Sequence, residues 1–132
     1  MTVDDETLLA RAKAVRLAAH APYSKYLVGV AVLDGNGDIH VGCNVENVSY
    51  PEGICAESNA IGSMVAAGGK KIVSIVVVGG VRDLEACTPC GGCRQRILEF
   101  SDEHTRVLFL DGGGRMRASS IREMLPAPFS PP

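Results

Sequence analysis

The sequence has few of the residues that proteins use to bind nucleic acids. Its 132 residues include no tryptophan, three tyrosines and three phenylalanines, which is too few for a row of side chains on which bases could stack. Thirteen Lys and Arg residues stand against fifteen Asp and Glu residues, so the net charge is −2, and no run of like charge occurs. Because a protein that binds phosphates normally carries a basic face, a small ligand is favoured over a polymer.

A long hydrophobic segment is missing as well. The most apolar stretch, Ile72–Val78, has seven residues and contains Ser74, whereas a helix that crosses a bilayer needs about 20 apolar residues. The first residues, Met1–Glu6, end in three acidic side chains, where a secretory signal would be basic and then hydrophobic. We therefore expect a cytoplasmic protein without a membrane helix.

The composition is that of one folded domain. A length of 132 residues is typical of a single domain, and 46% apolar against 21% charged residues excludes a disordered chain. No linker and no internal repeat interrupts the chain. We therefore expect a single domain over residues 1–132.

Hydrophobic periodicity, turn residues and helix caps predict the element order αββαβαβα. Helices are expected at residues 5–19, 55–67, 88–100 and 120–123. Strands are expected at residues 28–33, 39–43, 72–79 and 107–110, with a weaker candidate near Met116.

Two of these helices each lie between strands, which is typical of βαβ crossovers packed on both faces of one sheet. The segment Ile72–Gly79 is β-branched and almost wholly apolar, so it should be a central strand that is buried on both faces. The predicted fold class is α/β, a three-layer α/β/α sandwich with a mixed sheet of four to five strands.

Cysteine is the unusual feature of the composition. Five cysteines are an odd number in a chain without a secretory signal, which favours a reducing compartment and argues against a disulfide framework. Three of them fall within seven residues, a spacing that indicates metal binding or catalysis. The five are Cys43, Cys55, Cys87, Cys90 and Cys93.

Cys55, Cys90 and Cys93 are the candidate metal ligands. With Thr88 as the helix cap and Pro89 at the first helical position, Cys90 and Cys93 would share the first turn and one side of a helix. Cys55 starts another helix, and helix N-termini stabilise thiolates. Three thiolates suit Zn²⁺ and leave a fourth tetrahedral position for water, which is the arrangement of a catalytic site.

Glu57 is the candidate proton-transfer residue, because it follows Cys55 by two residues and needs only to face the open metal position. The alternative is an ordinary carboxylate in the first turn of a helix, where the dipole favours acidic residues. For the cysteines, the alternative is a structural Cys₄ zinc site that includes Cys87, and hence a zinc-stabilised interaction module that is not an enzyme. Loss of zinc from a Cys87→Ser variant would favour that alternative.

Two motifs, Cys55-Ala56-Glu57 and Pro89–Gln95, resemble those of the small zinc-dependent cytidine deaminases of the homotetrameric type. The resemblance covers nearly the whole chain. Its further motifs, in chain order, are Ala21–Tyr26, Val28-Gly29, Gly42–Asn47 and Leu125-Pro126 with Phe129.

The resemblance implies a cytidine-deaminase-like domain in which Cys55, Cys90 and Cys93 bind zinc and Glu57 transfers protons. The reaction it implies is the hydrolytic deamination of cytidine and 2′-deoxycytidine to uridine and 2′-deoxyuridine with release of ammonia, in pyrimidine salvage. Deamination of a cytosine nucleoside analogue such as blasticidin S is the alternative among enzymes.

The resemblance also implies substrate-binding residues. Asn44 and Glu46 are expected to bind the ribose, and their i, i+2 spacing in an extended segment points both side chains the same way. Tyr26 is expected to flank the base, and the backbone of Ala56 to contact the pyrimidine edge. The residues expected to be shared between the subunits of a homotetramer are Tyr50 and Phe129.

The chain departs from the resemblance at two positions. Ser58 stands where the family often has an arginine that offsets the charge of three thiolates on one zinc. Zn²⁺ with three thiolates carries −1, and only the helix ends and Arg94 are candidates to balance it, so we expect water activation to differ from that in arginine-bearing relatives. Tyr26 replaces the more usual phenylalanine and adds a hydroxyl group that needs a partner.

The remaining candidates are assigned structural roles. Cys43 is expected to be a small buried hydrophobic residue, and Asn47 a turn former. Gly112–Gly114 follow a strand but lack the lysine of a phosphate-binding loop. Three histidines lie outside every motif and are expected at the surface: His20, His40 and His104.

Overall fold

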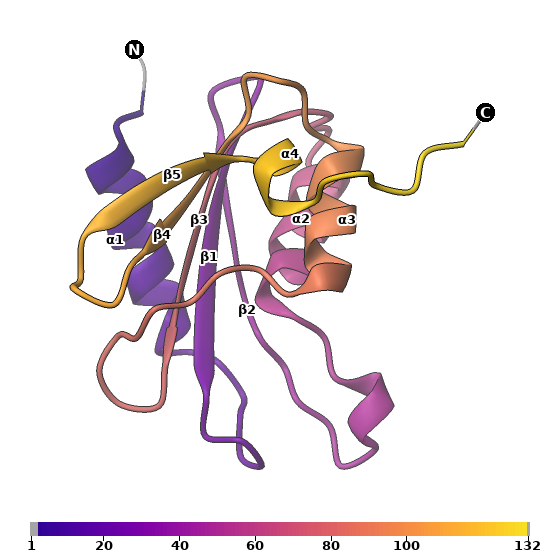
Figure 1. Ribbon diagram of the computed structural model, residues 1–132. Coiled ribbons are helices and arrows are strands. Elements are labelled where there is room, and N and C mark those ends of the chain that lie inside the picture. Colours follow the sequence, from indigo (N-terminus) through magenta and orange to yellow (C-terminus); the bar gives the residue numbers. More distant parts are fainter. Residues whose placement is uncertain (1–2, 132) are drawn as a thin grey trace.

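Five strands form one mixed sheet in the computed structural model, which describes residues 3–131 (Figure 1). The strands are β1 Leu27–Asp34, β2 Ile39–Cys43, β3 Ile72–Gly80, β4 Arg106–Leu110 and β5 Met116–Ser120. Their order across the sheet is β2-β1-β3-β4-β5. β3 and β4 pair in parallel, and the other neighbouring pairs are antiparallel. The predicted mixed sheet is confirmed, and the weak candidate near Met116 is its fifth strand.

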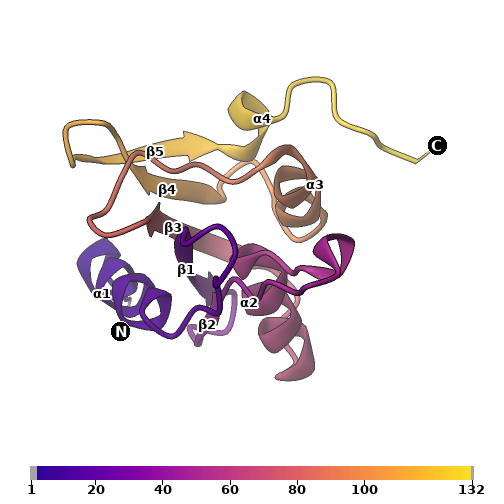
Figure 2. The ribbon, with the colours of Figure 1, turned by 90° about the horizontal axis from the view of Figure 1, so that it is seen from below.

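Helices cover both faces of this sheet (Figure 2). Helix α1, Asp5–Arg16, packs on one face, whereas α2, Ala56–Ala66, and α3, Gly91–Glu99, pack on the other. A short 3-10 helix spans Tyr50–Glu52, and α4 spans Ile121–Met124. The predicted three layers are confirmed, but the two crossover helices share one face instead of covering both. Among residues 3–131, no helix combines the length and the apolar character needed to cross a membrane.

β3 is the central strand, as predicted. Eight of its nine residues are buried, because helices pack against it from both sides. Val76 belongs to the cluster that contains Leu8 of α1, and Ile75 belongs to the cluster that contains Met64 of α2 and Ile97 of α3. Full burial of such a side chain contributes about 1.5–3 kcal/mol, so this strand holds the two helical layers together.

Strand direction explains why α2 and α3 begin at the same edge of the sheet (Figure 1). β2 and β3 are both antiparallel to β1, so they run in the same direction. α2 follows β2 and α3 follows β3, and each helix starts beyond the carboxyl end of its strand. Two helix N-termini, with backbone N–H groups that have no partner inside the helix, therefore lie at one edge.

α1 ends earlier than predicted, at Arg16 and not at Ala19. The Arg16 side chain is buried and donates hydrogen bonds to the backbone carbonyl groups of Leu27 and Gly80. These bonds tie the last turn of α1 to the start of β1 and the end of β3. The chain turns directly afterwards, with the Ala18 amide bonded to the Val15 carbonyl.

α3 begins later than predicted, because its cap is a different residue. Cys90 and not Thr88 is the N-cap, so Pro89 lies before the helix. The Arg94 side chain turns back and donates to the Pro89 carbonyl at 2.8 Å and to the Thr88 hydroxyl at 3.2 Å. These bonds hold residues 88 and 89 outside the helix. Cys93 stays in the first turn, as predicted.

The β1–β2 hairpin contains a histidine that was wrongly predicted at the surface. The His40 side chain is 10% exposed and lies 2.7 Å from the Asp34 carboxylate. Burial acts to raise the pKa of Asp34, but hydrogen bonds from His40 and from two backbone amides of the turn outweigh it, so the pKa is lowered. The other two histidines, His20 and His104, are exposed as predicted.

α2 comes very close to β2 at Gly42. A β-carbon at this position would lie 2.4 Å from the Ala60 backbone nitrogen and 2.6 Å from the Ala56 carbonyl oxygen. Both atoms belong to the helix backbone, so no side-chain rotation relieves the clash. Glycine at position 42 therefore sets how closely the first turn of α2, whose N-cap is Cys55, approaches the sheet.

We predict that Gly42→Ala destabilises the fold by about 1–3 kcal/mol, the usual cost of overpacking. Gly62→Ala is the matched control, because a β-carbon at Gly62 in α2 meets nothing within 4 Å and alanine is favoured over glycine inside a helix by about 0.5–1 kcal/mol. Urea unfolding followed by circular dichroism measures both changes. Equal unfolding midpoints for Gly42→Ala and the wild type would show that the contact does not matter.

Candidate active site

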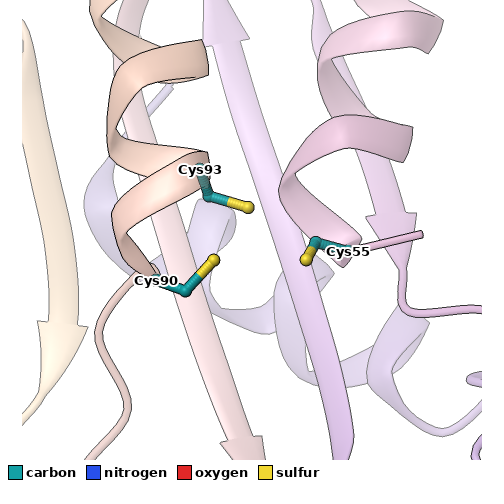
Figure 3. Close-up of side chains that lie close together, drawn as sticks. All are labelled: Cys55, Cys90 and Cys93. Carbon is teal, nitrogen blue, oxygen red and sulfur yellow. The ribbon is translucent and has the colours of Figure 1, made fainter. Parts of the chain in front are cut away.

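The three cysteines predicted to bind a metal lie together where α2 and α3 begin (Figure 3). Cys55 is the N-cap of α2, Cys90 is the N-cap of α3, and Cys93 lies in the first turn of α3. Their sulfur atoms all lie within 4.8 Å of one another. Figure 3 shows the three sulfurs pointing into the space between the two helices.

The donor set and its spacing fit Zn²⁺. Tetrahedral zinc with Zn–S bonds of about 2.3 Å holds its sulfurs about 3.8 Å apart, so this cluster needs only small side-chain movements to close around the ion. Three protein ligands leave one position open, as in catalytic zinc sites. Within residues 3–131, no other group of three or more His, Cys, Asp or Glu side chains is arranged to hold a metal.

The surroundings of the three thiols give them different pKa values. Burial raises the pKa of Cys55 and of Cys93. Burial also acts to raise the pKa of Cys90, but the backbone amide and thiol of Cys93 beside it outweigh this effect and lower that pKa. The pKa of one ligand is therefore lower than those of the other two, and because metal binds the thiolate form, metal binding releases protons from thiols.

Glu57 is the second residue of α2, and only 5% of it is exposed. Burial raises the pKa of its carboxyl group, against the opposing effects of its own backbone amide, the Cys93 thiol and Arg96. A carboxyl group whose pKa moves toward neutrality can both accept and donate a proton at physiological pH. This burial distinguishes Glu57 from an ordinary first-turn carboxylate on a helix surface.

A cavity of about 460 Å³ lies beside the sulfur cluster, within the size range of small-molecule sites. Six residues predicted at the active site line it: Tyr26, Asn44, Cys55, Ala56, Glu57 and Cys90. Cys93 is fully buried in the first turn of α3. Residues that the sequence did not single out as cavity walls complete the lining: Val28, Ala86, Cys87 and Thr88.

Asn44 follows β2 directly, and its side chain holds the neighbouring strand. Its amide nitrogen donates to the Tyr26 carbonyl at 2.9 Å, and its amide oxygen accepts from the Val28 backbone N–H at 2.8 Å. One N–H and one lone pair of this amide are left for a ligand. Asn44 therefore combines a structural role with free hydrogen-bonding capacity at the cavity wall.

Glu46 does not line the same cavity as Asn44. Together with Tyr23 and Tyr50 it lines a second hollow, of about 350 Å³. Its carboxylate accepts hydrogen bonds from the Ser24 hydroxyl and from the backbone amides of Tyr23 and Ser24. These bonds turn the Glu46 side chain toward residues 23 and 24, so the i, i+2 spacing did not bring the two predicted ribose residues to one cavity.

Tyr50 and Phe129 also lie outside the cavity beside the cluster. Tyr50, in the 3-10 helix, is 75% exposed and meets Tyr23 edge-on, with the ring centroids 5.7 Å apart. Phe129 is 78% exposed on the segment after α4, and its carbonyl accepts from the Gln95 side chain at 3.2 Å. Neither ring is part of the wall of that cavity.

Known proteins resemble this chain over most of its length. The sequence profile of the cytidine and deoxycytidylate deaminase zinc-binding region matches residues 2–110. A cytidine deaminase of Sporosarcina psychrophila is 37% identical over 129 residues, which cover 97% of this chain and 93% of the relative. The chain belongs to the cytidine and deoxycytidylate deaminase family. A probable cytidine deaminase of Dictyostelium discoideum is 41% identical and covers 85% of this chain and 74% of its own.

Solved structures of this family share the fold. The cytidine deaminase of Burkholderia pseudomallei has a TM-score of 0.87 at 37% identity and covers 96% of this chain and 100% of its own. The cytidine deaminase of Mycobacterium tuberculosis has a TM-score of 0.82 at 34% identity and covers 97% and 98%. The predicted family and fold class are thus confirmed. The match to a zinc-binding region and the three-sulfur cluster together identify Zn²⁺ as the cofactor.

Cys87 lines the cavity, a position that no pattern in the sequence indicated. Its sulfur is not part of the three-sulfur cluster but lies over Gly79, beside the Tyr26 ring. Burial and the neighbouring Cys87 thiol raise the pKa of Tyr26 to about 12, so the additional hydroxyl group lies beside a thiol. No local sequence signal indicates this contact, because the two residues meet only through the pairing of β1 with β3. The other cysteine, Cys43, is half-buried.

We predict that Cys87→Ser keeps about one zinc ion per chain, because three other thiols supply the ligands. Cys90→Ser removes one of the three and is expected to lose most of the bound zinc. Zinc content measured by atomic emission after gel filtration compares the two variants. Zinc loss from Cys87→Ser would instead support the four-cysteine structural site.

Proposed function

We propose that the chain catalyses the hydrolytic deamination of cytidine and 2′-deoxycytidine in pyrimidine salvage. The products are uridine or 2′-deoxyuridine and ammonia, so the enzyme is a hydrolase that breaks a C–N bond. The observation that supports this most is the buried Glu57 carboxyl group beside the sulfur cluster, in the wall of a cavity of about 460 Å³. Relatives that cover nearly the whole chain are named cytidine deaminases, which supports the same substrate class.

The reaction needs a nucleophilic oxygen next to C4 of the pyrimidine ring. Bound Zn²⁺ supplies a Lewis acid that makes water nucleophilic near neutral pH. Glu57 takes the proton that this water loses and gives it to ring nitrogen N3 while the oxygen adds to C4. Glu57 then moves the remaining hydroxyl proton to the amino group, which leaves as ammonia. A pKa raised by burial suits a group that must be base and acid in turn.

The cavity wall offers contacts for both sides of a pyrimidine. The Tyr26 ring lines the cavity, where it can flank the face of the base. Ala56 is the first residue of α2, so its backbone N–H has no acceptor inside the helix and is free for the pyrimidine edge. These two residues position C4 relative to Glu57.

We predict that Glu57→Gln keeps the fold and its zinc but lowers the rate on cytidine by about 10²–10⁴-fold, the usual contribution of general acid–base catalysis. Glu6→Gln is the matched control, because Glu6 is an exposed carboxylate in the first turn of α1 and should not affect the rate. The loss of cytidine absorbance measures activity, beside the zinc content of each variant. Zinc-loaded wild type that is inert on every cytosine nucleoside would overturn the proposal.

The ribose is proposed to bind to Asn44 and Glu46. Asn44 keeps one free N–H at the cavity wall. Glu46 lines the other hollow, so its carboxylate would have to turn away from residues 23 and 24 to accept hydrogen bonds from sugar hydroxyl groups. An amide and a carboxylate favour a plain ribose over a modified nucleoside such as blasticidin S. A panel of cytidine, 2′-deoxycytidine and blasticidin S separates these substrates.

Glu46→Gln is expected to lower kcat/KM for cytidine by about 10–100-fold, mainly through KM, because a hydrogen bond to a charged group is worth about 1.5–3 kcal/mol. Glu52→Gln is the control, since Glu52 is an exposed carboxylate in the nearby 3-10 helix. Steady-state kinetics on cytidine compares the variants. An unchanged KM in Glu46→Gln would remove Glu46 from the substrate site.

A single domain over residues 1–132 and a homotetramer with shared active sites are also proposed. Tyr50 and Phe129 support the homotetramer, because both are large apolar residues that are mostly exposed and lie outside the cavity of their own chain. Five free cysteines support a reducing, cytoplasmic location.

A further inference from the structure

The zinc site carries more negative charge than its ion neutralises. Three thiolates and one Zn²⁺ have a net charge of −1, and Glu57 adds a carboxyl group beside them. Cys93 is fully buried and Glu57 is nearly so. Unbalanced charge is costly where water is excluded, so a cation is expected nearby.

Arg94, the cation that the sequence suggests, does not face the sulfurs. Its guanidinium group donates to the carbonyl oxygens of Pro89 at 2.8 Å and Met124 at 2.7 Å, and to the Thr88 hydroxyl. Arg94 therefore fixes the backbone before α3 to the end of α4. Its hydrogen-bonding capacity is used for the scaffold of the site and not for the cluster.

Arg96 is the cation that reaches the cluster. Its Nη1 lies 3.8 Å from the Cys93 sulfur, and because Arg96 follows Cys93 by three residues on α3, both side chains lie on one side of the helix. Nη1 also lies 3.6 Å from the place that a β-carbon would take at Gly92. The guanidinium group thus folds back over the first turn of α3, where it also favours the charged form of Glu57.

Ser58 on α2 lies across from Arg96. Both line the hollow between α2 and α3, together with Gly62 and Glu99. Gly62 follows Ser58 by four residues on the same side of α2 and adds no side chain, so the hollow has room for a guanidinium group. Glu99 forms no ion pair with Arg96 among the residues described here. A guanidinium group from position 58 would enter the same hollow from its opposite wall.

We propose that Arg96 is a positioning residue of the zinc site, which donates a hydrogen bond to the Cys93 sulfur and balances the excess negative charge from α3. The inference rests on the proposed function, because it concerns the same site. A cation beside the ligands stabilises the metal-bound cluster, which carries a net negative charge. Residues that hydrogen-bond to metal ligands typically change metal affinity 10–100-fold when they are removed.

The test follows zinc release, which does not depend on catalysis. Zinc-loaded proteins are mixed with an excess of a chromogenic chelator, and the rate of colour formation is recorded. Arg96→Met removes the charge and keeps most of the side-chain length, so release is expected to be about 10–100-fold faster. Arg11→Met is the matched control, because Arg11 is exposed on α1, on the opposite face of the sheet, and its release rate should equal that of the wild type.

Two further variants distinguish loss of the positive charge from a general disturbance of the fold. Arg96→Lys keeps the positive charge without the planar fork, so its release rate is expected between those of the wild type and Arg96→Met. Ser58→Arg in the Arg96→Met background returns a guanidinium group from α2 and is expected to restore slow release. Failure of this double variant to slow release relative to Arg96→Met alone would overturn the proposed charge balance across the hollow.

The absorption bands of Co²⁺-substituted protein provide a second test, because a residue with only a structural role would not shift them. In Co²⁺-substituted protein, the thiolate-to-cobalt charge-transfer bands are expected at longer wavelength in Arg96→Met, because the sulfur electrons lose a stabilising donor. A zinc-release rate equal to that of the wild type, together with unshifted bands in Arg96→Met, would overturn the inference. If Arg96→Met does not fold, Arg96→Gln is measured with the same expectations. Release that depends on Arg96 in a chain inert on cytosine nucleosides would support this inference and overturn only the proposed substrate.

Discussion

The site depends on two helix N-termini that meet at one edge of the sheet. β2 and β3 run in the same direction on either side of β1, so the helices that follow them start side by side. Cys55 and Cys90 occupy the same cap position in the two helices. Helix dipoles and free backbone N–H groups favour negative charge there, and the close approach at Gly42 holds α2 in place. Three thiolates can therefore gather where side chains alone would repel one another.

Three arginines stabilise this edge of the molecule in different ways. Arg16 joins α1 to the start of β1 and the end of β3, and Arg94 joins the backbone before α3 to the end of α4. Both use the several N–H donors of one rigid guanidinium group to satisfy carbonyl oxygens from separate segments. Arg96 differs because it meets a sulfur. Arg16 and Arg94 thus fix the backbone around the cluster without contacting its ligands, whereas Arg96 contacts the Cys93 sulfur.

Local sequence signals predicted structure wherever the tertiary contacts agree with them. The apolar run of β3 is buried as expected, and the spacing of the cysteines located the metal ligands because two helix starts carry them. The start of α3 was wrong, since Arg94 folds back on Thr88 and Pro89 and keeps two good cap residues out of the helix. Glu46 is a similar case: strand alternation predicts the side of a regular strand, but hydrogen bonds to residues 23 and 24 decide where this carboxylate lies.

Tyr50 and Phe129 are predicted substrate-binding residues that lie outside the cavity of their own chain, and assembly of several chains can account for this. At 75% and 78% exposed, and outside the cavity that holds Glu57, both rings are free to contact a substrate that is bound in a second copy of the chain. In the proposed homotetramer, each substrate site is then complete only after assembly, so dilution below the dissociation constant of the subunits weakens substrate binding. Zinc binding uses α2 and α3 of one chain and does not share this dependence. Substrate binding therefore depends on the equilibrium of subunit assembly, whereas zinc binding does not.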